Sequence, residues 1–217
     1  MHPQAFIFDL DGTLVDSLHD IADALNRALR DHALPEAPVE MVRGWVGNGL
    51  RALCREACGA AAPDDVEGVV KSALTHYRSR VVARTCLYPN IMQMLELLKA
   101  GGARMAVLSN KPHDLTVEVI RQLGIHSFFT DVRGPDTEET RKPAPQGIWS
   151  ILAGLRVAPN DAFMIGDSAI DIQTARNSGA KSVAVTWGFR PVEELFSAGP
   201  DFLVEDPLEI PHLLKKN

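Results

Sequence analysis

The sequence predicts an α/β fold: a doubly wound parallel sheet with an inserted helical segment. In the second half of the chain, short apolar runs alternate with helical patterns, which is typical of parallel sheets. Between Ser17 and Arg84, by contrast, the patterns are helical and show no convincing strand alternation. We therefore expect a core formed by residues 1–16 and 85–217, with residues 17–84 as a small helical bundle inserted after the first strand.

The first expected strand, residues 5–8, is an apolar run that leads directly into two carboxylates. Asp9 and Asp11 lie two residues apart, so in an extended chain their side chains share one side while Leu10 points into apolar packing. Gly12 lets the backbone turn just afterwards. Neighbouring acids at a buried strand end repel each other, and a hard divalent cation relieves the repulsion most simply. The pattern therefore favours magnesium, although acids after a strand are also common turn formers.

Helical patterns fill the inserted segment. Ser17 is the expected N-cap of the first helix, and Asp20 three residues later completes a start that resembles a capping box. Apolar spacing predicts helices over residues 17–34, 39–43, 50–57 and 66–82.

Three glycines interrupt the helical run at residues 44–51. Glycine content alone favours a turn between helices. The alternative is a substrate-contacting loop, in which backbone amides and polar side chains hold a small carboxylate. The candidate specificity residues of that loop are Gly47, Asn48, Gly49 and Arg51.

The rest of the sheet follows in the second half of the chain. Further strands are expected over residues 103–108, 128–132, 162–165, 182–185 and 201–204. Further helices are expected over residues 91–100, 113–123, 143–155, 169–178 and 208–215. Ligands of such sheets bind at the carboxyl ends of the strands, where we expect Asp9, Ser109 and Asp167 to fall.

Four short motifs carry a resemblance to a known family. Residues 9–17, Asp-Leu-Asp-Gly-Thr-Leu-Val-Asp-Ser, resemble the first motif of the haloacid dehalogenase-like (HAD) hydrolase superfamily. Ser109, the Lys-Pro-Ala-Pro string at 142–145 and the Gly-Asp-Ser-Ala-Ile-Asp string at 166–171 are similar to its other three motifs, in the same order. The Trp-Val-Gly-Asn-Gly string at 45–49 resembles bacterial phosphoglycolate phosphatases of this superfamily. The resemblance implies a Rossmann-like core, a helical cap and hydrolysis of 2-phosphoglycolate to glycolate and phosphate.

The resemblance also implies roles in phosphoryl transfer. Asp9 would be the nucleophile that forms an aspartyl-phosphate, and Asp11 would be the general acid and base. Lys142 would neutralise both Asp9 and the phosphoryl group, and a lysine at a helix start needs such a reason because the helix dipole disfavours it. Ser109 and Asn110 would bind phosphoryl oxygens together with Lys142.

A Mg²⁺ site is implied by the same motifs. Its protein ligands would be Asp9, the backbone carbonyl of Asp11, and Asp167. Asp171, one helical turn further on, would reach the ion through water or orient Lys142. An N-cap role is the competing interpretation of Asp167, since this residue also opens a helix.

Composition limits the classes of partner. The net charge of -6 and the pI near 5.6 disfavour nucleic acid, and no apolar run approaches the roughly 18 residues of a membrane span. The chain enters its first strand without a basic and apolar leader, so we expect a cytoplasmic protein. Its three cysteines do not suggest a disulfide framework. The expected partner is a small phosphorylated metabolite, and the chain is expected to be a monomer or a homodimer.

Several alternatives share the expected core chemistry. A β-phosphoglucomutase-like phosphosugar mutase is one, and a phosphatase for another small metabolite or for pyrophosphate is a second. Dehalogenases are disfavoured because they lack the second acid that Asp11 supplies, and phosphonatases because the only lysine of the insertion is Lys71, far from the glycine-rich loop. A regulatory module without turnover is disfavoured because all four motifs are intact.

Overall fold

The computed structural model describes residues 4–59, 65–135 and 137–214. The expected core and insertion also include residues 1–3, 60–64, 136 and 215–217, which lie outside the described residues. No helix in the described part of the chain combines the length and the apolar character needed to cross a membrane.

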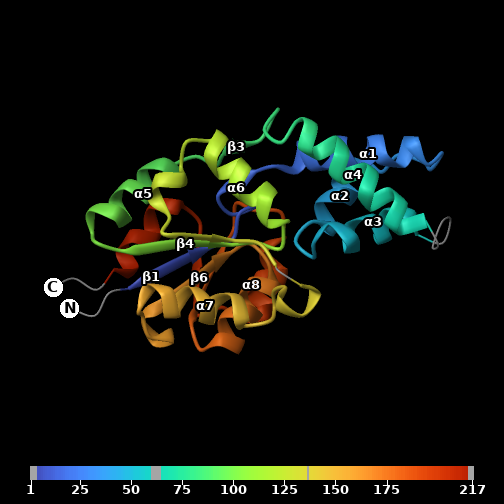
Figure 1. Cartoon of the computed structure of the whole chain (residues 1–217). Coiled ribbons are helices and arrows are strands. Elements are labelled where there is room, and N and C mark those ends of the chain that lie inside the picture. The colour runs from blue at the N-terminus through green and yellow to red at the C-terminus, as the bar shows by residue number, and fades with distance from the viewer. Residues whose placement is uncertain (1–3, 60–64, 136, 215–217) are drawn as a thin grey trace.

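Six parallel strands form the central sheet, in the order β5-β4-β1-β6-β7-β8, which confirms the predicted fold class (Figure 1). The strands are β1 (Ala5–Phe8), β4 (Arg104–Leu108), β5 (Asp131–Arg133), β6 (Ala162–Gly166), β7 (Lys181–Val185) and β8 (Phe202–Val204). Because β1 lies between β4 and β6, the residues that follow these three strands meet at one edge of the sheet.

Helices cover both faces of the sheet. In Figure 1, α5 (Ile91–Ala100) and α6 (His113–Gln122) lie on one face, and α7 (Gln146–Leu155) and α8 (Ala169–Ser178) lie on the other. A further helix, α9 (Val192–Ala198), packs beside α8. Short 3₁₀ turns connect these elements at His126–Phe128, Glu138–Thr140 and Pro159–Asp161, and a longer 3₁₀ segment, Pro207–Leu213, follows β8.

The central strand β1 is buried on both sides. Phe6 and Phe8 belong to one apolar cluster together with Leu95 of α5, whereas Ile7 belongs to the cluster that contains Ile148 of α7. All four residues of β1 are fully buried. This alternate packing holds the strand on both faces, and it therefore fixes the position of Asp9, the residue that follows it.

The described residues of the inserted segment form four helices, which lie beside the carboxyl edge of the sheet (Figure 1). They are α1 (Leu18–Asp31), α2 (Val39–Trp45), α3 (Leu50–Cys58) and α4 (Val66–Ser79). Their apolar faces form a separate cluster, which includes Leu25, Leu53 and Val69. Phe189, from the core, joins this cluster and ties the two parts together.

Two short strands connect the insertion to the core, and sequence analysis does not predict them. β2 (Val15–Asp16) pairs antiparallel with β3 (Cys86–Leu87), so the outgoing and returning chains lie side by side. Strands of two residues have no periodicity from which they could be recognised.

Ser17 is the N-cap residue of α1, as predicted, but Ser17 and Asp20 do not form the expected capping box. The hydroxyl of Ser17 makes no cap hydrogen bond, and it donates to Oδ1 of Asp11 at 2.6 Å. Asp20 accepts hydrogen bonds from the backbone of Ala83, Arg84 and Thr85, where the chain returns from the insertion. Burial would raise the pKa of Asp20, but these hydrogen bonds lower it overall. Both side chains therefore fix the junction of the two parts, not the start of α1.

Several boundaries differ from the sequence predictions. The strand expected at 128–132 begins at Asp131, because the residues before it form a 3₁₀ turn. The helix expected at 143–155 begins at Gln146, after Pro145. The last expected helix is a 3₁₀ segment, Pro207–Leu213, and its expected end at Lys215 lies outside the described residues.

Candidate active site

The carboxyl edge of the sheet brings together the acids that the sequence analysis selected. Asp9 follows β1 and Asp167 follows β6, and the two strands are hydrogen-bonded neighbours. Gly12 has a φ of 85°, and a side chain at this position would collide with the carboxylate of Asp167. Glycine therefore allows both the turn after Asp11 and the close approach of the two strand ends.

Three buried carboxylates form a cluster at this edge. Each of Asp9, Asp167 and Asp171 offers one oxygen, and these oxygens all lie within 4.8 Å of one another. Lys142 lies among them: its Nζ is 2.9 Å from Oδ1 of Asp9 and 2.7 Å from Oδ1 of Asp171. All four side chains are almost completely buried.

Burial and mutual repulsion perturb the protonation of this cluster. Burial raises the pKa of Asp9 to about 6, and Lys142 only partly opposes the shift. Burial, followed by the charges of Asp171 and Asp9, raises the pKa of Asp167 to about 8. Burial alone would lower the pKa of Lys142, but the carboxylates of Asp171 and Asp9 outweigh it and raise that pKa. The single positive charge of Lys142 therefore does not neutralise the three carboxylates of the cluster.

The donor set of this cluster fits a divalent cation. Three converging carboxylates with a single ammonium leave negative charge in a buried place, and hard oxygen ligands are those that Mg²⁺ prefers. Asp9 and Asp167, both predicted as ligands, belong to the cluster. The cluster also contains Asp171, which was expected from the sequence to reach the ion only through water or to orient Lys142.

Local structure at the start of α8 gives separate tasks to Asp167 and Asp171. The N-cap of α8 is Ser168, so the competing N-cap interpretation of Asp167 is wrong. Asp167 accepts a hydrogen bond from the backbone of Phe189 at 2.7 Å. Asp171 accepts from both the backbone and the hydroxyl of Ser168, and its other oxygen holds Lys142. A side chain at Gly166 would collide with Asp171.

Asp11 lies outside the carboxylate cluster, and its side chain has two partners of its own. Its Oδ1 accepts from the hydroxyl of Ser17, and Nζ of Lys111 is 2.9 Å from each of its two oxygens. Burial would lower the pKa of Lys111, but Asp11 and then Tyr77 outweigh it and raise that pKa. This buried contact with Lys111 fixes the position of the Asp11 side chain beside the carboxylate cluster.

Sequence reasoning missed Lys111. It lies two residues after Ser109, at the same strand end, and that position was the available signal. Its ammonium also lies 4.6 Å from the ring centroid of Tyr77, which belongs to α4 of the insertion. Lys111 therefore connects the core to the helical insertion.

Ser109 and Asn110 follow β4, as expected, and Asn110 also contacts the insertion. The hydroxyl of Ser109 accepts from the backbone of Lys111 at 3.2 Å. The side-chain amide of Asn110 donates to the carbonyl of Gly47 at 2.8 Å, and its oxygen accepts from the backbone of Lys142 at 2.9 Å. Asn110 thus joins the Lys142 loop to the glycine-rich loop.

Core side chains hold the glycine-rich loop by its carbonyl groups. Arg141 donates to the carbonyl of Asn48 at 2.7 Å, and Arg190 donates to those of Gly44 and Val46 at 2.7 and 2.6 Å. Gly47 and Gly49 line the pocket beneath. These contacts place the loop directly over the carboxyl edge of the sheet.

Arg51 and Asn48 are not among the described residues that line the pocket. Nε of Arg51 lies 2.5 Å from Glu67, and both side chains are at least half exposed. A residue that follows a glycine loop can point to either side of its helix, and here an acidic partner lies on the outer side.

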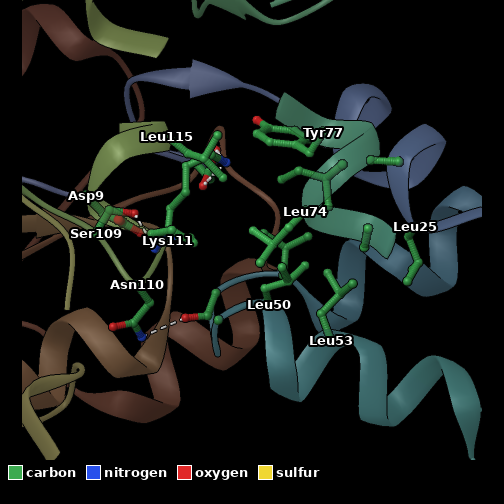
Figure 2. A pocket seen from close by; sticks show the side chains of 18 residues that line it. Asp9, Leu25, Leu50, Leu53, Leu74, Tyr77, Ser109, Asn110, Lys111 and Leu115 are labelled. Carbon is green, nitrogen blue, oxygen red and sulfur yellow. Dashed lines mark hydrogen bonds and ion pairs between the residues drawn. The ribbon is translucent and has the colours of Figure 1, made fainter. Parts of the chain in front are cut away.

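The pocket between core and insertion has a polar floor and an apolar wall (Figure 2). Asp9, Asp11, Ser109, Asn110 and Lys111 form the floor, from the strand ends of the core. The wall comes from the helices and includes Ile21, Leu25, Leu50, Leu53, Leu74 and Leu115. Such an arrangement suits a small ligand with one strongly polar end.

Comparison with known proteins gives a consistent result. The family model described as "Haloacid dehalogenase-like hydrolase" matches residues 6–185. Phosphoglycolate phosphatase of Colwellia psychrerythraea is 34% identical, over 98% of this chain and 97% of its own. Phosphoglycolate phosphatase of Caulobacter vibrioides is 35% identical, over 94% of this chain and 87% of its own. The crystal structure of a predicted phosphoglycolate phosphatase from Haemophilus somnus has a TM-score of 0.90 and 30% identity, covering 99% of both chains.

Proposed function

The chain belongs to the haloacid dehalogenase-like hydrolase family, and we propose that it is a magnesium-dependent phosphatase that hydrolyses 2-phosphoglycolate to glycolate and phosphate. The observation that carries this proposal is the buried group at the strand ends, where Asp9, Lys142, Asp167 and Asp171 converge. The similarity to phosphoglycolate phosphatases over nearly the whole chain supports the choice of substrate.

Magnesium would be held by Asp9 and Asp167, with Asp171 close by and with the backbone carbonyl of Asp11. When bound, the ion supplies positive charge that offsets the phosphate dianion and the carboxylates around it. Lys142 supplies a second positive charge, and its contact with Asp9 keeps it beside the attacking oxygen. Together these charges allow one anion, Asp9, to approach another, the phosphoryl group.

In the first half of the proposed reaction, a carboxylate oxygen of Asp9 attacks phosphorus in line with the ester bond. The new bond joins phosphorus to Asp9, and the bond between phosphorus and the glycolate oxygen breaks. Asp11 enters this step in its protonated form and gives its proton to that departing oxygen, so the leaving group departs as an alcohol. Ser109 and the backbone amide of Asn110 bind the phosphoryl oxygens that do not react.

In the second half, water attacks the phosphorus of the aspartyl-phosphate. Asp11, now a carboxylate, takes a proton from this water, and the bond from phosphorus to Asp9 breaks. Phosphate leaves, and both acids return to their starting states. The contacts of Ser17 and Lys111 with Asp11 keep its carboxylate in one place for both proton transfers.

The insertion would exclude bulk water and select the leaving group. Its helices place an apolar wall opposite the charged floor, and the glycine-rich loop lies over the strand ends. A dry site strengthens the electrostatic interactions at the floor. A small leaving group would fit between floor and wall, and a bulky one would collide with the leucines.

Phosphate release across a panel of phosphorylated metabolites tests the proposal. We expect steady release from 2-phosphoglycolate with MgCl₂ and loss of release when the metal is removed by a chelator. Pyrophosphate and hexose phosphates belong in the panel. Interconversion of glucose phosphates without net phosphate release would show that the activity is that of a mutase and not of a phosphatase. Phosphate release that does not depend on metal would contradict the role of the carboxylate cluster.

A further inference from the structure

Of the specificity residues expected from the sequence, Gly47 and Gly49 line the pocket but have no side chain that could donate a hydrogen bond, and Asn48 and Arg51 are not among its described lining residues. Arg51 pairs with Glu67 on the outer surface of the insertion. Arg141 and Arg190 bind carbonyl groups of the glycine-rich loop. Among the described residues that line the pocket, Lys111 carries the only cationic side chain.

A hydroxyl whose proton has no acceptor lies near this cation. Tyr77 lines the same pocket and is 6% exposed, yet its hydroxyl is buried and finds no acceptor for its proton among the described residues. In Figure 2 the hydroxyl points toward the side of the pocket that holds Lys111 and Leu115, away from Leu50 and Leu53. Burial raises the pKa of Tyr77, so the hydroxyl keeps its proton and remains a donor. A buried donor without an acceptor is costly, and a ligand oxygen would satisfy it.

We propose that Lys111 and Tyr77 together form the subsite for the carboxylate of the substrate. The inference rests on the proposed function, since it assigns the part of 2-phosphoglycolate that is not transferred. It makes Lys111 and Tyr77 specificity residues: the first comes from the core, the second from helix α4 of the insertion.

Distances within the site support this assignment. Asp11, as proton donor, must lie at hydrogen-bond distance from the ester oxygen, and Lys111 is 2.9 Å from both oxygens of Asp11. In 2-phosphoglycolate the carboxylate is one methylene away from that ester oxygen. The substrate carboxylate therefore falls within reach of the Lys111 ammonium, which has three N–H donors and directs two of them at Asp11.

The apolar wall makes this pair necessary. A carboxylate that leaves water for a pocket lined by leucines loses its hydration, and it binds only if charge and hydrogen bonds replace that hydration. An ammonium and a phenolic hydroxyl supply both. Because one donor lies on the core and the other on the insertion, the substrate carboxylate would bridge the two parts of the molecule.

The test compares two esters that differ in the carboxylate, 2-phosphoglycolate and ethyl phosphate. In the unaltered enzyme kcat/KM should be far higher for 2-phosphoglycolate. In Tyr77→Phe it should fall about tenfold for 2-phosphoglycolate and stay within about twofold for ethyl phosphate. Lys111→Met should slow both esters, because Lys111 also holds Asp11, but the preference for 2-phosphoglycolate should fall by about a hundredfold. Tyr88→Phe and Lys71→Met, at residues that do not line the pocket, should keep the preference.

The outcomes separate the inference from the proposed function. If Tyr77→Phe and Lys111→Met slow the hydrolysis of both esters by equal factors, or slow the hydrolysis of neither ester, the proposed subsite is wrong. The proposed phosphatase activity is not affected by that result. If the unaltered enzyme hydrolyses ethyl phosphate as fast as 2-phosphoglycolate, the carboxylate is not recognised and the subsite is again wrong. If neither these esters nor any other phosphorylated metabolite releases phosphate, the proposed function itself fails and the inference fails with it.

Discussion

The floor and the wall of the pocket are built in different ways. The floor consists of short polar side chains that follow adjacent parallel strands, and ion pairs and hydrogen bonds hold each of them. The wall consists of apolar side chains from helices of the insertion and from α6 of the core. The difference separates two tasks: floor residues would act on the phosphoryl group of every substrate, whereas wall residues would choose among leaving groups.

The largest effect should come from Asp9→Asn. An amide of the same shape keeps the packing at the end of β1 but removes the nucleophile, so phosphate release should fall by at least about a thousandfold for every ester. The melting temperature serves as the control for folding. Undiminished turnover in this variant would remove Asp9 from the chemistry.

Lys142→Met should be the next largest change. It leaves Asp9 and Asp171 as buried carboxylates without their ammonium, so the free energy of unfolding should fall by about 3 kcal/mol and kcat by about a hundredfold. Urea unfolding and phosphate release measure the two effects. Adding Asp171→Asn should recover part of the lost stability, and a strictly additive double variant would show that the two residues are not coupled.

Asp167→Asn should stabilise the metal-free protein at alkaline pH. The folded pKa of about 8 lies above the ordinary value of 3.8, so the folded state binds more protons than the unfolded state between these limits. Stability of the metal-free protein should therefore fall as pH rises through this window, and the variant should regain on the order of 2 kcal/mol at about pH 9. Thermal unfolding of both proteins in the presence of a chelator measures this difference in stability. MgCl₂ is expected to stabilise only the parent protein. Equal pH dependence in both proteins would contradict the raised pKa.

Leu74→Ala should change the choice of substrate more than the rate. Removing this side chain enlarges the pocket beside the floor, so kcat/KM for a bulkier ester such as phenyl phosphate should rise about tenfold relative to 2-phosphoglycolate. Leu97→Ala is the control, because Leu97 is exposed on α5. A uniform loss for both esters would show that the wall supports the floor without selecting substrates.

Arg51→Ala should have the smallest effect. Its ion pair with Glu67 is exposed, and such pairs contribute less than about 1 kcal/mol. Activity on 2-phosphoglycolate should stay within about twofold of the parent. A large increase in KM would restore Arg51 as a substrate ligand and would weaken the case for Lys111.

The same contrast explains what the sequence could predict. The sequence predicts Asp9 and Asp167 at the carboxyl ends of strands, because a parallel sheet brings such ends to one edge, whatever the details of packing. That the two strands are neighbours is known only from the structure. The outward direction of Arg51 and the inward direction of Tyr77 depend on how four helices pack against one another, and no local pattern records that. Lys111 follows Ser109 at a predicted strand end, but its contacts with Asp11 and Tyr77 are known only from the structure.

Covalent trapping tests the central claim most directly. During turnover of 2-phosphoglycolate with MgCl₂, rapid quenching followed by borohydride reduction converts an aspartyl-phosphate to homoserine, and mass spectrometry of peptides locates it. We predict homoserine at position 9 in the parent and none in Asp9→Asn. Modification of a different residue, or the same modification in Asp9→Asn, would contradict the proposal that Asp9 takes the phosphoryl group.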